Sequence, residues 1–187
     1  LKDLLDPEKP LIFTEGEKKT LSGNHNGFLT IGISGVANWK TKNDEGQVQP
    51  LTEFSEMNLR GRKVYICFDN DSITNPQVMK AEGQFASYLQ SQGAKVKIIR
   101  LPFDGERKIG FDDFLVDHTT EEFQKLIDEA IYPLNMDAES LVELIHSLKD
   151  KNPEEVNTAI KSIIPIVASK NPLEADILIK EIAKATK

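Results

Sequence analysis

Short apolar runs alternate with helix-like stretches through the first part of the chain. Four runs are rich in apolar and β-branched side chains, which is typical of buried strands. They are residues 11–14, 28–33, 64–68 and 95–101. Between them lie stretches that favour short or amphipathic helices, at residues 17–21, 51–58 and 77–92. This alternation predicts an α/β fold with a central, mainly parallel sheet.

The pattern changes after the last predicted strand. Thr119 and Glu122 have the spacing of a capping box for a helix that ends near residue 130, and residues 132–135 resemble a linker. Three more amphipathic helices are expected, and Pro165 predicts a kink or break in the middle one. Their expected bounds are 137–149, 153–169 and 172–186. We therefore expect an α/β domain at 1–132, including its closing helix, and a small C-terminal helical domain at 136–187.

Residues 40–50 (KTKNDEGQVQP) separate the second strand from the third. The segment is polar and contains Gly46 and Pro50, so we expect an exposed loop.

The third run is followed by two aspartates, in the sequence KVYICFDND. If the chain stays extended, Asp69 and Asp71 point to one side and Asn70 to the other. Two carboxylates held this close repel each other unless a cation lies between them or water screens them. Mg²⁺ prefers carboxylate oxygens, so the pair predicts a magnesium site.

Other candidate residues also fall at expected strand ends. Glu15 follows the first strand and Gly35 follows the second. In open parallel sheets, binding sites form beyond the carboxyl ends of the strands. Glu15, Gly35 and the two aspartates are therefore expected at the same edge of the sheet.

The charge of the chain limits the kind of nucleic-acid contact that it can make. With 23 Lys and Arg against 30 Asp and Glu, the net charge is −7, which excludes a uniformly basic binding surface. Local basic clusters remain, and most such clusters are solvated faces. They are Lys18/Lys19, Lys40/Lys42, Arg60/Arg62/Lys63, Lys95/Lys97/Arg100 and Arg107/Lys108.

Composition also constrains the compartment and the chemistry. The single cysteine, Cys67, lies in a predicted strand, so a buried thiol in a cytoplasmic protein is expected, without a disulfide. The start resembles neither a signal peptide nor a membrane span, and because residue 1 is Leu we expect a piece of a longer protein. No P-loop or Gly-x-Gly-x-x-Gly motif occurs. The scattered His25, His118 and His146 lack metal-ligand spacing.

The ordered set of motifs resembles the Toprim domain of topoisomerases and bacterial-type or plasmid and phage primases. The resemblance runs from about residue 10 to 116 and is most specific in IFTEGEKKT and YICFDND. It implies a Toprim-like Rossmannoid fold. It also implies that Glu15, Asp69 and Asp71 are catalytic and bind the metal, Mg²⁺ or Mn²⁺. Many members have an aspartate where this chain has Lys19, which leaves the role of that position open.

Two other stretches extend the resemblance. Residues 108–115 (KIGFDDFL) look like the segment that closes the domain in plasmid and phage primases, and residues 160–187 are similar to helices that follow the core in bacterial replicative primases. The resemblance implies phosphate or nucleic-acid contacts at four basic residues, Lys18, Lys19, Arg107 and Lys108. It implies supporting roles at Gly16, Gly35, Asp112 and Asp113.

The function expected from this resemblance is primer synthesis. Mg²⁺-dependent transfer of nucleoside triphosphates on single-stranded DNA would take place within a larger mobile-element replication protein that has a helicase domain or partner. Two alternatives stay open. One is nuclease or topoisomerase chemistry in the same fold, and the other is a non-catalytic docking module for a replicative helicase, which the net charge and Lys19 favour. Sequence does not decide whether Glu15 is a metal ligand or an acid/base.

Overall fold

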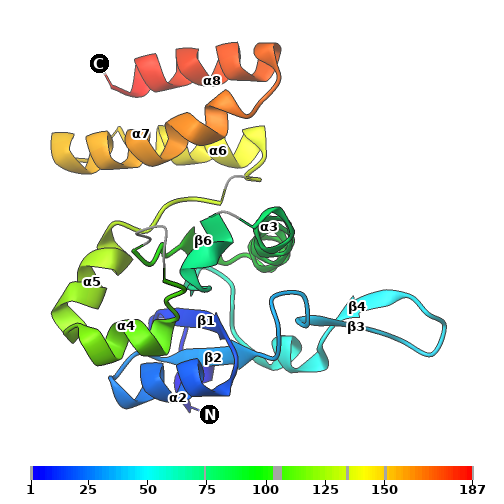
Figure 1. Ribbon diagram of the computed structural model, residues 1–187. Helices are drawn as coiled ribbons and strands as arrows, with labels where there is room; N and C mark the ends of the chain where they lie inside the picture. Colours follow the sequence, from blue (N-terminus) through cyan, green and yellow to red (C-terminus); the bar gives the residue numbers. More distant parts are fainter. Residues whose placement is uncertain (1, 74, 103–106, 134, 150, 187) are drawn as a thin grey trace. The chain divides into compact units, whose positions relative to one another are not determined.

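The computed structural model describes residues 2–73, 75–102, 107–133, 135–149 and 151–186 (Figure 1). The chain divides into two compact units, residues 1–130 and 131–187, which are taken separately below.

A four-stranded parallel sheet forms the centre of the first unit. The strands are β1 (Leu11–Glu15), β2 (Thr30–Ile33), β5 (Lys63–Ile66) and β6 (Lys95–Ile98), and their order in the sheet is β2-β1-β5-β6. All three pairings are parallel, because each connection crosses over before the next strand begins. The α/β fold with a mainly parallel sheet, expected from the alternating pattern, is confirmed.

The crossover helices cover opposite faces of this sheet. The chain passes from β1 through α2 (Glu17–His25) to β2 in one direction, and from β5 through α3 (Pro76–Ser91) to β6 in the other. Since such crossovers are right-handed, the two helices lie on opposite faces. Figure 1 shows α2 beside α4 (Phe111–Asp117), with α3 on the far side of the sheet. The strand order therefore reverses between β1 and β5, which is where ligands bind in open α/β sheets.

Alternate residues of the strands supply the two halves of the core. On the α3 side, Phe13 of β1 packs edge-on against Phe85, with 5.1 Å between the ring centroids. On the other side, Ile12 and Cys67 join a cluster with Phe111 of α4 and with Phe123 of α5 (Thr120–Asp128). Cys67 is fully buried, and desolvation raises the pKa of its thiol, as expected for an inert core cysteine.

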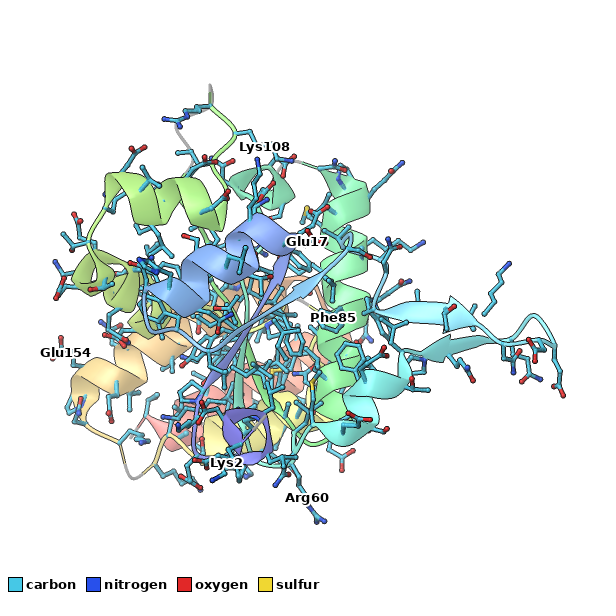
Figure 2. All side chains as sticks on the ribbon, turned by 90° about the horizontal axis from the view of Figure 1, so that it is seen from below. Lys2, Glu17, Arg60, Phe85, Lys108 and Glu154 are labelled. Carbon is cyan, nitrogen blue, oxygen red and sulfur yellow. The ribbon has the colours of Figure 1, made fainter. Side chains whose placement is uncertain are left out.

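Four charged residues show which end of the first unit holds the carboxyl ends of the strands. Figure 2 shows Lys108 and Glu17 at one end of the unit and Lys2 and Arg60 at the opposite end. Glu17 directly follows β1 and Arg60 precedes β5, so the Lys108 end is the one where the strands terminate.

The predicted loop at residues 40–50 is instead an antiparallel hairpin, which corrects that expectation. Strands β3 (Lys40–Lys42) and β4 (Val48–Pro50) pair, and Figure 1 shows the hairpin extending away from the sheet. The Asn43 side chain accepts hydrogen bonds from the backbone N–H groups of Glu45 and Gln47, which closes the turn. At the base of the hairpin, Trp39 stacks on Tyr88 of α3 with 4.9 Å between the ring centroids.

Three short elements complete the first unit. They are α1 (Lys2–Leu5) and the 3₁₀ helices η1 (Thr52–Glu56) and η2 (Asn70–Ile73). The capping box expected at Thr119 is present, since Thr119 donates its N–H to Glu122 and accepts the N–H of Glu122. It begins α5 at the predicted place.

Arg62 belongs to a sequence cluster interpreted as a solvated basic face, and that interpretation is wrong for this residue. Its side chain is fully buried. The guanidinium donates to the backbone carbonyls of Lys9 at 2.8 Å and Asp3 at 2.9 Å, and also to that of Leu4. Five N–H donors in a rigid fork suit several carbonyls at once, so Arg62 holds α1 against the sheet and is not available to phosphate.

The second unit consists of three helices around one apolar cluster. They are α6 (Ala138–His146), α7 (Pro153–Ala168) and α8 (Pro172–Ala185). Asn152 and Asn171 accept hydrogen bonds from the N–H groups of Glu155 and Glu174, as expected for N-caps placed before proline. Helix α7 continues through Pro165 without a break. Leu141, Ile163 and Leu178 are among the buried side chains that hold these helices together.

Within the described part of the chain, no helix combines the length and the apolar character that crossing a membrane requires.

Replacing Arg62 tests its structural role. We expect Arg62→Ala to lower the free energy of unfolding by about 2–4 kcal/mol, because the truncation leaves a cavity and removes the donors of three carbonyls. The exposed Arg60→Ala is the matched control, with a change within about 0.5 kcal/mol. Urea denaturation of both variants provides the measurement, and equal midpoints would contradict the assignment.

A second prediction concerns pH and the helical unit. Hydrogen bonds from His146 (2.7 Å) and Lys184 (2.7 Å) lower the pKa of Glu181 from 4.5 to about 2. A lowered folded-state pKa contributes stability that is present above pH 4.5 and is lost as the pH falls towards 2. We expect the stability difference between wild type and Glu181→Gln to shrink across this window. Denaturation followed by circular dichroism at several pH values measures it, with Glu143→Gln as the control that shows no such trend.

Candidate functional site

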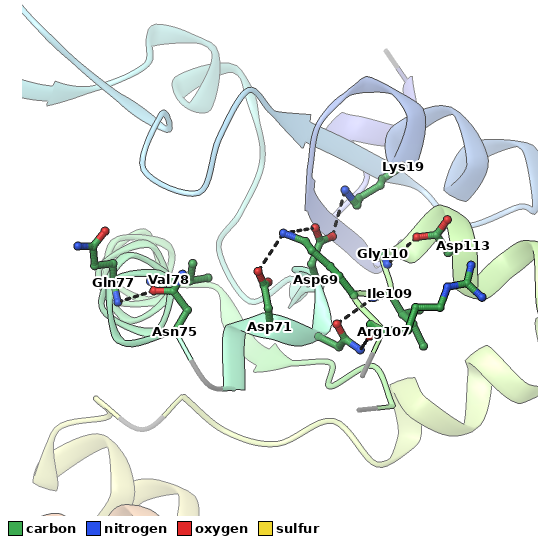
Figure 3. Close-up of polar contacts among 12 residues, drawn as sticks. Lys19, Asp69, Asp71, Asn75, Gln77, Val78, Arg107, Ile109, Gly110 and Asp113 are labelled. Atoms are coloured by element: carbon green, nitrogen blue, oxygen red, sulfur yellow. Dashed lines mark hydrogen bonds and ion pairs between the residues drawn. The ribbon is translucent and has the colours of Figure 1, made fainter. Parts of the chain in front are cut away.

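Asp69 and Asp71 follow β5 at the point where the strand order reverses. The chain stays paired beyond the strand, since Cys67 donates its N–H to the carbonyl of Phe13 at 2.8 Å. Asp69 then lies mostly buried, with 8% of its side chain exposed, whereas Asp71, in η2, is 34% exposed. The two carboxylates lie on the same side of the chain, as the sequence predicted, and a lysine ammonium lies between them (Figure 3). The predicted metal ion stays a prediction.

Asn70 points the other way and organises the segment that closes the site. Its Nδ2 donates to the carbonyls of Pro102 (2.9 Å) and Arg107 (3.0 Å), and its Oδ1 accepts the N–H of Ile109 (2.9 Å). The backbone N–H of Asn70 also donates to the carbonyl of Ile109 at 3.0 Å. Asn70 is 1% exposed, so its amide is buried and well satisfied. It fixes the backbone on both sides of Lys108.

The cation between the aspartates is the ammonium group of Lys108. Its Nζ lies 3.1 Å from Oδ2 of Asp69 and 2.9 Å from Oδ2 of Asp71. The hydrogen bond to Asp71 is the main reason why the pKa of Lys108 is raised. A second ammonium, that of Lys19 in α2, lies 3.0 Å from Oδ1 of Asp69 (Figure 3). Two lysines therefore neutralise two carboxylates.

A largely buried ion pair, between Arg100 and Glu82, contacts η2. Glu82 of α3 is 5% exposed and accepts two hydrogen bonds from Arg100, at 2.7 Å each. Arg100 also donates to the hydroxyl of Ser72, at 3.1 Å. The guanidinium of Arg100 is therefore engaged in contacts within the protein, which corrects the interpretation of this residue as part of a solvated basic cluster. It ties the turn that carries Asp71 to β6 and α3.

Gly110 and α4 form the wall opposite the aspartates. Asp113 caps the start of α4 by accepting the N–H of Gly110 at 3.0 Å. A Cβ on Gly110 would lie 2.5 Å from Cε of Lys19 and 3.1 Å from Oδ1 of Asp69. A larger residue there would displace the end of the Lys19 side chain, so glycine leaves room for Lys19 to reach Asp69. Asp112 also lies near Gly110, with its Oδ1 2.8 Å from the position that such a Cβ would take.

Glu15 is the last residue of β1, and its turn is tightly packed. Gly16 follows with φ of 87°, a conformation that favours glycine, and its N–H donates to the carbonyl of Ile33 at 2.9 Å. The hydroxyl of Thr20 donates to the carbonyl of Gly16 at 2.8 Å. A Cβ on Gly32 would lie 2.1 Å from that hydroxyl, so this position requires glycine.

A cleft of about 460 Å³ opens beside this turn. Its lining includes Gly16, Glu17 and Thr20 from the start of α2, and Gly32 and Ser34 from the end of β2. It lies at the carboxyl ends of β1 and β2, the edge at which the sequence predicted a site.

The remaining predicted residues are more peripheral. Lys18 is exposed on α2, and Arg107 lies 3.5 Å from Asp117, with 62% of the Arg107 side chain exposed. Gly35 has φ of 141° and lies next to the Asn38 side chain, so it serves the turn after β2. The structure does not test the roles that the sequence predicted for these three residues.

The aspartate pair meets the donor requirements of a divalent ion. Oδ1 of Asp69 is buried and accepts no hydrogen bond among the described residues, although Lys19 lies at ion-pair distance. Mg²⁺ is commonly bound by one or two carboxylates together with water and substrate phosphates, and this set supplies two carboxylates. Within the described ranges, no group of three or more Asp, Glu, His or Cys side chains could hold a metal ion. The structure thus groups Asp69 with Asp71 and does not add Glu15 as a third ligand, whose role stays a prediction.

Sequence reasoning missed three residues that shape the site, namely Asn70, Arg100 and Gly110. The signal for Asn70 was available, because an asparagine between two aspartates at a strand end must satisfy its own amide when it is buried. Arg100 and Gly110 depend on contacts between segments far apart in the chain, which no local pattern reveals.

Comparison with known proteins assigns the family. A family model described as a domain of unknown function, DUF3854, matches residues 3–122, and the chain belongs to this family. An uncharacterized protein of Picosynechococcus sp. is 32% identical over 126 residues, which cover 62% of this chain and 12% of that protein.

The chain is also distantly related to DNA primase. A protein of Clostridium acetobutylicum named DNA primase is 26% identical over 176 residues, covering 94% of this chain and 26% of that protein. The chain thus spans at most about a quarter of the length of these curated relatives. A crystal structure of the Aquifex aeolicus primase, with its zinc-binding and RNA polymerase domains, aligns with a TM-score of 0.44 at 18% identity, over 94% of this chain and 37% of that one.

Asn70 provides a test of how the site is held. We expect Asn70→Ala to lower the free energy of unfolding by about 2–3 kcal/mol, since it removes the side-chain hydrogen bonds to three backbone groups, those of Pro102, Arg107 and Ile109. Exchange of the Ile109 amide hydrogen should accelerate, because its acceptor is lost. The exposed Asn58→Ala is the control, and unchanged exchange at Ile109 in Asn70→Ala would contradict this role. Hydrogen exchange followed by NMR or mass spectrometry reports both variants.

Proposed function

We propose that residues 1–132 form a Toprim-like catalytic domain of a DNA primase, with the helices at 136–187 as a separate C-terminal domain. The observation that carries the proposal is the pairing of buried Asp69 with Asp71 around one cation at the reversal of strand order. The relationship to a protein named DNA primase, over nearly the whole chain, supports the same class of reaction.

The two aspartates would hold the metal ion. Mg²⁺ or Mn²⁺, when bound, neutralises phosphate charge and stabilises the charge that develops in nucleotidyl transfer. Oδ1 of Asp69 is buried and accepts no hydrogen bond from the described residues, although the Lys19 ammonium lies 3.0 Å away. Burial strengthens the attraction of this oxygen for a cation. Asp71 is more exposed, so its carboxylate can be reached from solvent.

The basic residues around the pair would bind phosphate. Lys108 is 59% exposed beside the aspartates and can reach an anion that arrives with the metal. Arg107 and Lys18 are exposed, whereas Lys19 is largely buried against Asp69. Because the chain carries a net charge of −7, a strong grip on single-stranded DNA would require other parts of the full-length protein, including a helicase domain or partner.

Glu15 keeps its proposed catalytic place at the end of β1. It ends the strand adjacent to β5, so it belongs to the same edge of the sheet as the aspartates. Outside a three-carboxylate metal cluster, the role that suits it better is acid/base chemistry on the substrate.

One observation favours a second candidate, a non-catalytic docking module. Lys19 and Lys108 together balance the charges of Asp69 and Asp71. A self-neutralised pair can serve as a structural ion-pair network without any metal. The two candidates differ in whether the chain binds a divalent ion.

The test of primase function uses Asp69→Asn with Asp113→Asn as its matched control. Asp69→Asn removes a metal ligand, so primer synthesis by the full-length protein should fall on the order of 100-fold or more. Asp113→Asn weakens only the cap of α4 and should retain most activity. Calorimetric titration of this chain with Mg²⁺ or Mn²⁺ is the accompanying measurement.

The outcomes separate the candidates. Binding by wild type that disappears in Asp69→Asn, together with loss of primer synthesis, supports the catalytic proposal. Failure of wild type to bind metal at millimolar concentration favours the docking module, and full primer synthesis by Asp69→Asn would refute the catalytic role.

A further inference from the structure

Lys108 occupies the position that a divalent ion would take. Its ammonium group contacts one oxygen of each aspartate, at 3.1 Å for Asp69 and 2.9 Å for Asp71. An ion that bridges the same two carboxylates needs this space. Lys108 and the metal are therefore alternative occupants of one position.

The two lysines at Asp69 differ in their freedom to leave. Lys19 is 19% exposed and projects from helix α2, with the end of its side chain close to Gly110. Lys108 is 59% exposed and comes from the non-helical residues before α4. Its side chain can turn towards solvent without displacing a core residue. Lys108, rather than Lys19, is therefore the lysine that can move away from the aspartates.

The backbone of Lys108 stays fixed when its side chain turns. Asn70 holds the carbonyl of Arg107 and the N–H of Ile109, the neighbours of Lys108 on both sides. The displaced ammonium therefore remains within one side-chain length of the aspartates. That is where phosphates bound to the same metal ion would lie.

Charge balance makes the displacement depend on an anion. With both lysines in place, two positive charges balance two negative charges around the partly buried pair. A divalent ion added alone brings excess positive charge and repels Lys108. A polyphosphate that arrives with the ion offers Lys108 new partners and restores the balance.

We propose that Lys108 is a two-position residue that couples metal binding to polyphosphate binding. This inference rests on the proposed metal site and names its substrate class, a metal-bound polyphosphate such as that of a nucleoside triphosphate. Without phosphate, Lys108 holds the metal position and keeps the affinity for a bare ion low. With phosphate, it moves to the anion and the two ligands bind cooperatively.

The experiment measures Mn²⁺ binding to the full chain by calorimetry, with and without inorganic tripolyphosphate. We expect Lys108→Met to bind Mn²⁺ alone roughly tenfold more tightly than wild type, because the competing charge is removed. Tripolyphosphate should increase Mn²⁺ affinity in wild type and much less in Lys108→Met. Lys108→Arg should behave like wild type, since it keeps the charge, and the exposed Lys125→Met controls for the change in net charge.

Circular dichroism confirms that each variant is folded, and Lys108→Gln replaces Lys108→Met if the latter is not. Equal or weaker binding of Mn²⁺ by the neutral variant than by wild type would overturn the inference and leave the metal site standing. The same holds if tripolyphosphate strengthens Mn²⁺ binding equally in both proteins. Absence of Mn²⁺ binding in every variant, with or without tripolyphosphate, would overturn the metal site and the inference together.

Discussion

The negative charge of the buried Asp69 determines which groups surround it at the carboxyl ends of the strands. A carboxylate that is 8% exposed loses most of its hydration, and the protein compensates with an ammonium group on each side. Lys19 comes from the helix after β1 and Lys108 from the segment before α4, so one buried charge draws together three parts of the chain. The glycine at position 110 leaves room for these groups to approach one another.

A buried amide and a second ion pair then hold the segments that these charges bring together. Asn70 ties the Lys108 segment to the end of β5, while Arg100 and Glu82 tie η2 to β6 and α3. Asn70 and Glu82 are buried, so their contacts are partly shielded from the salt and water that weaken surface contacts. The result is a firm frame around the exposed side chain of Lys108, which the proposed exchange of cations would leave undistorted.

Local patterns predicted the parts of this arrangement that depend on near neighbours. The apolar runs located all four strands of the sheet, and Asp69 and Asp71 lie on one side with Asn70 on the other, as expected. The condition attached to that prediction, an extended chain, is not met, because Asn70 and Asp71 belong to the 3₁₀ helix η2. The strand β5 itself is shorter than its apolar run, because Cys67 and Phe68 continue into the core beyond the last ladder residue. The turn at Asn43 was missed because a polar segment of this composition also suits an irregular loop.

Contacts between distant segments set the limit of such prediction. Arg62 and Arg100 belong to sequence clusters that resemble a solvated surface, yet their partners lie in other segments of the chain. Arg62 is buried, and Arg100 is paired with Glu82. The grouping of Glu15 with the aspartates depended on the same assumption, that residues at one edge of a sheet meet. A shared edge brings backbones near one another, but each side chain still has its own direction and its own partners.

The hairpin between β2 and β5 has a practical consequence. Its base is secured by the stacking of Trp39 on Tyr88, and its turn is closed by Asn43 within the hairpin itself. The tip thus extends away from the sheet and closes its own turn (Figure 1). A fluorophore or affinity tag inserted at Asp44 would report on the protein without touching the aspartate pair.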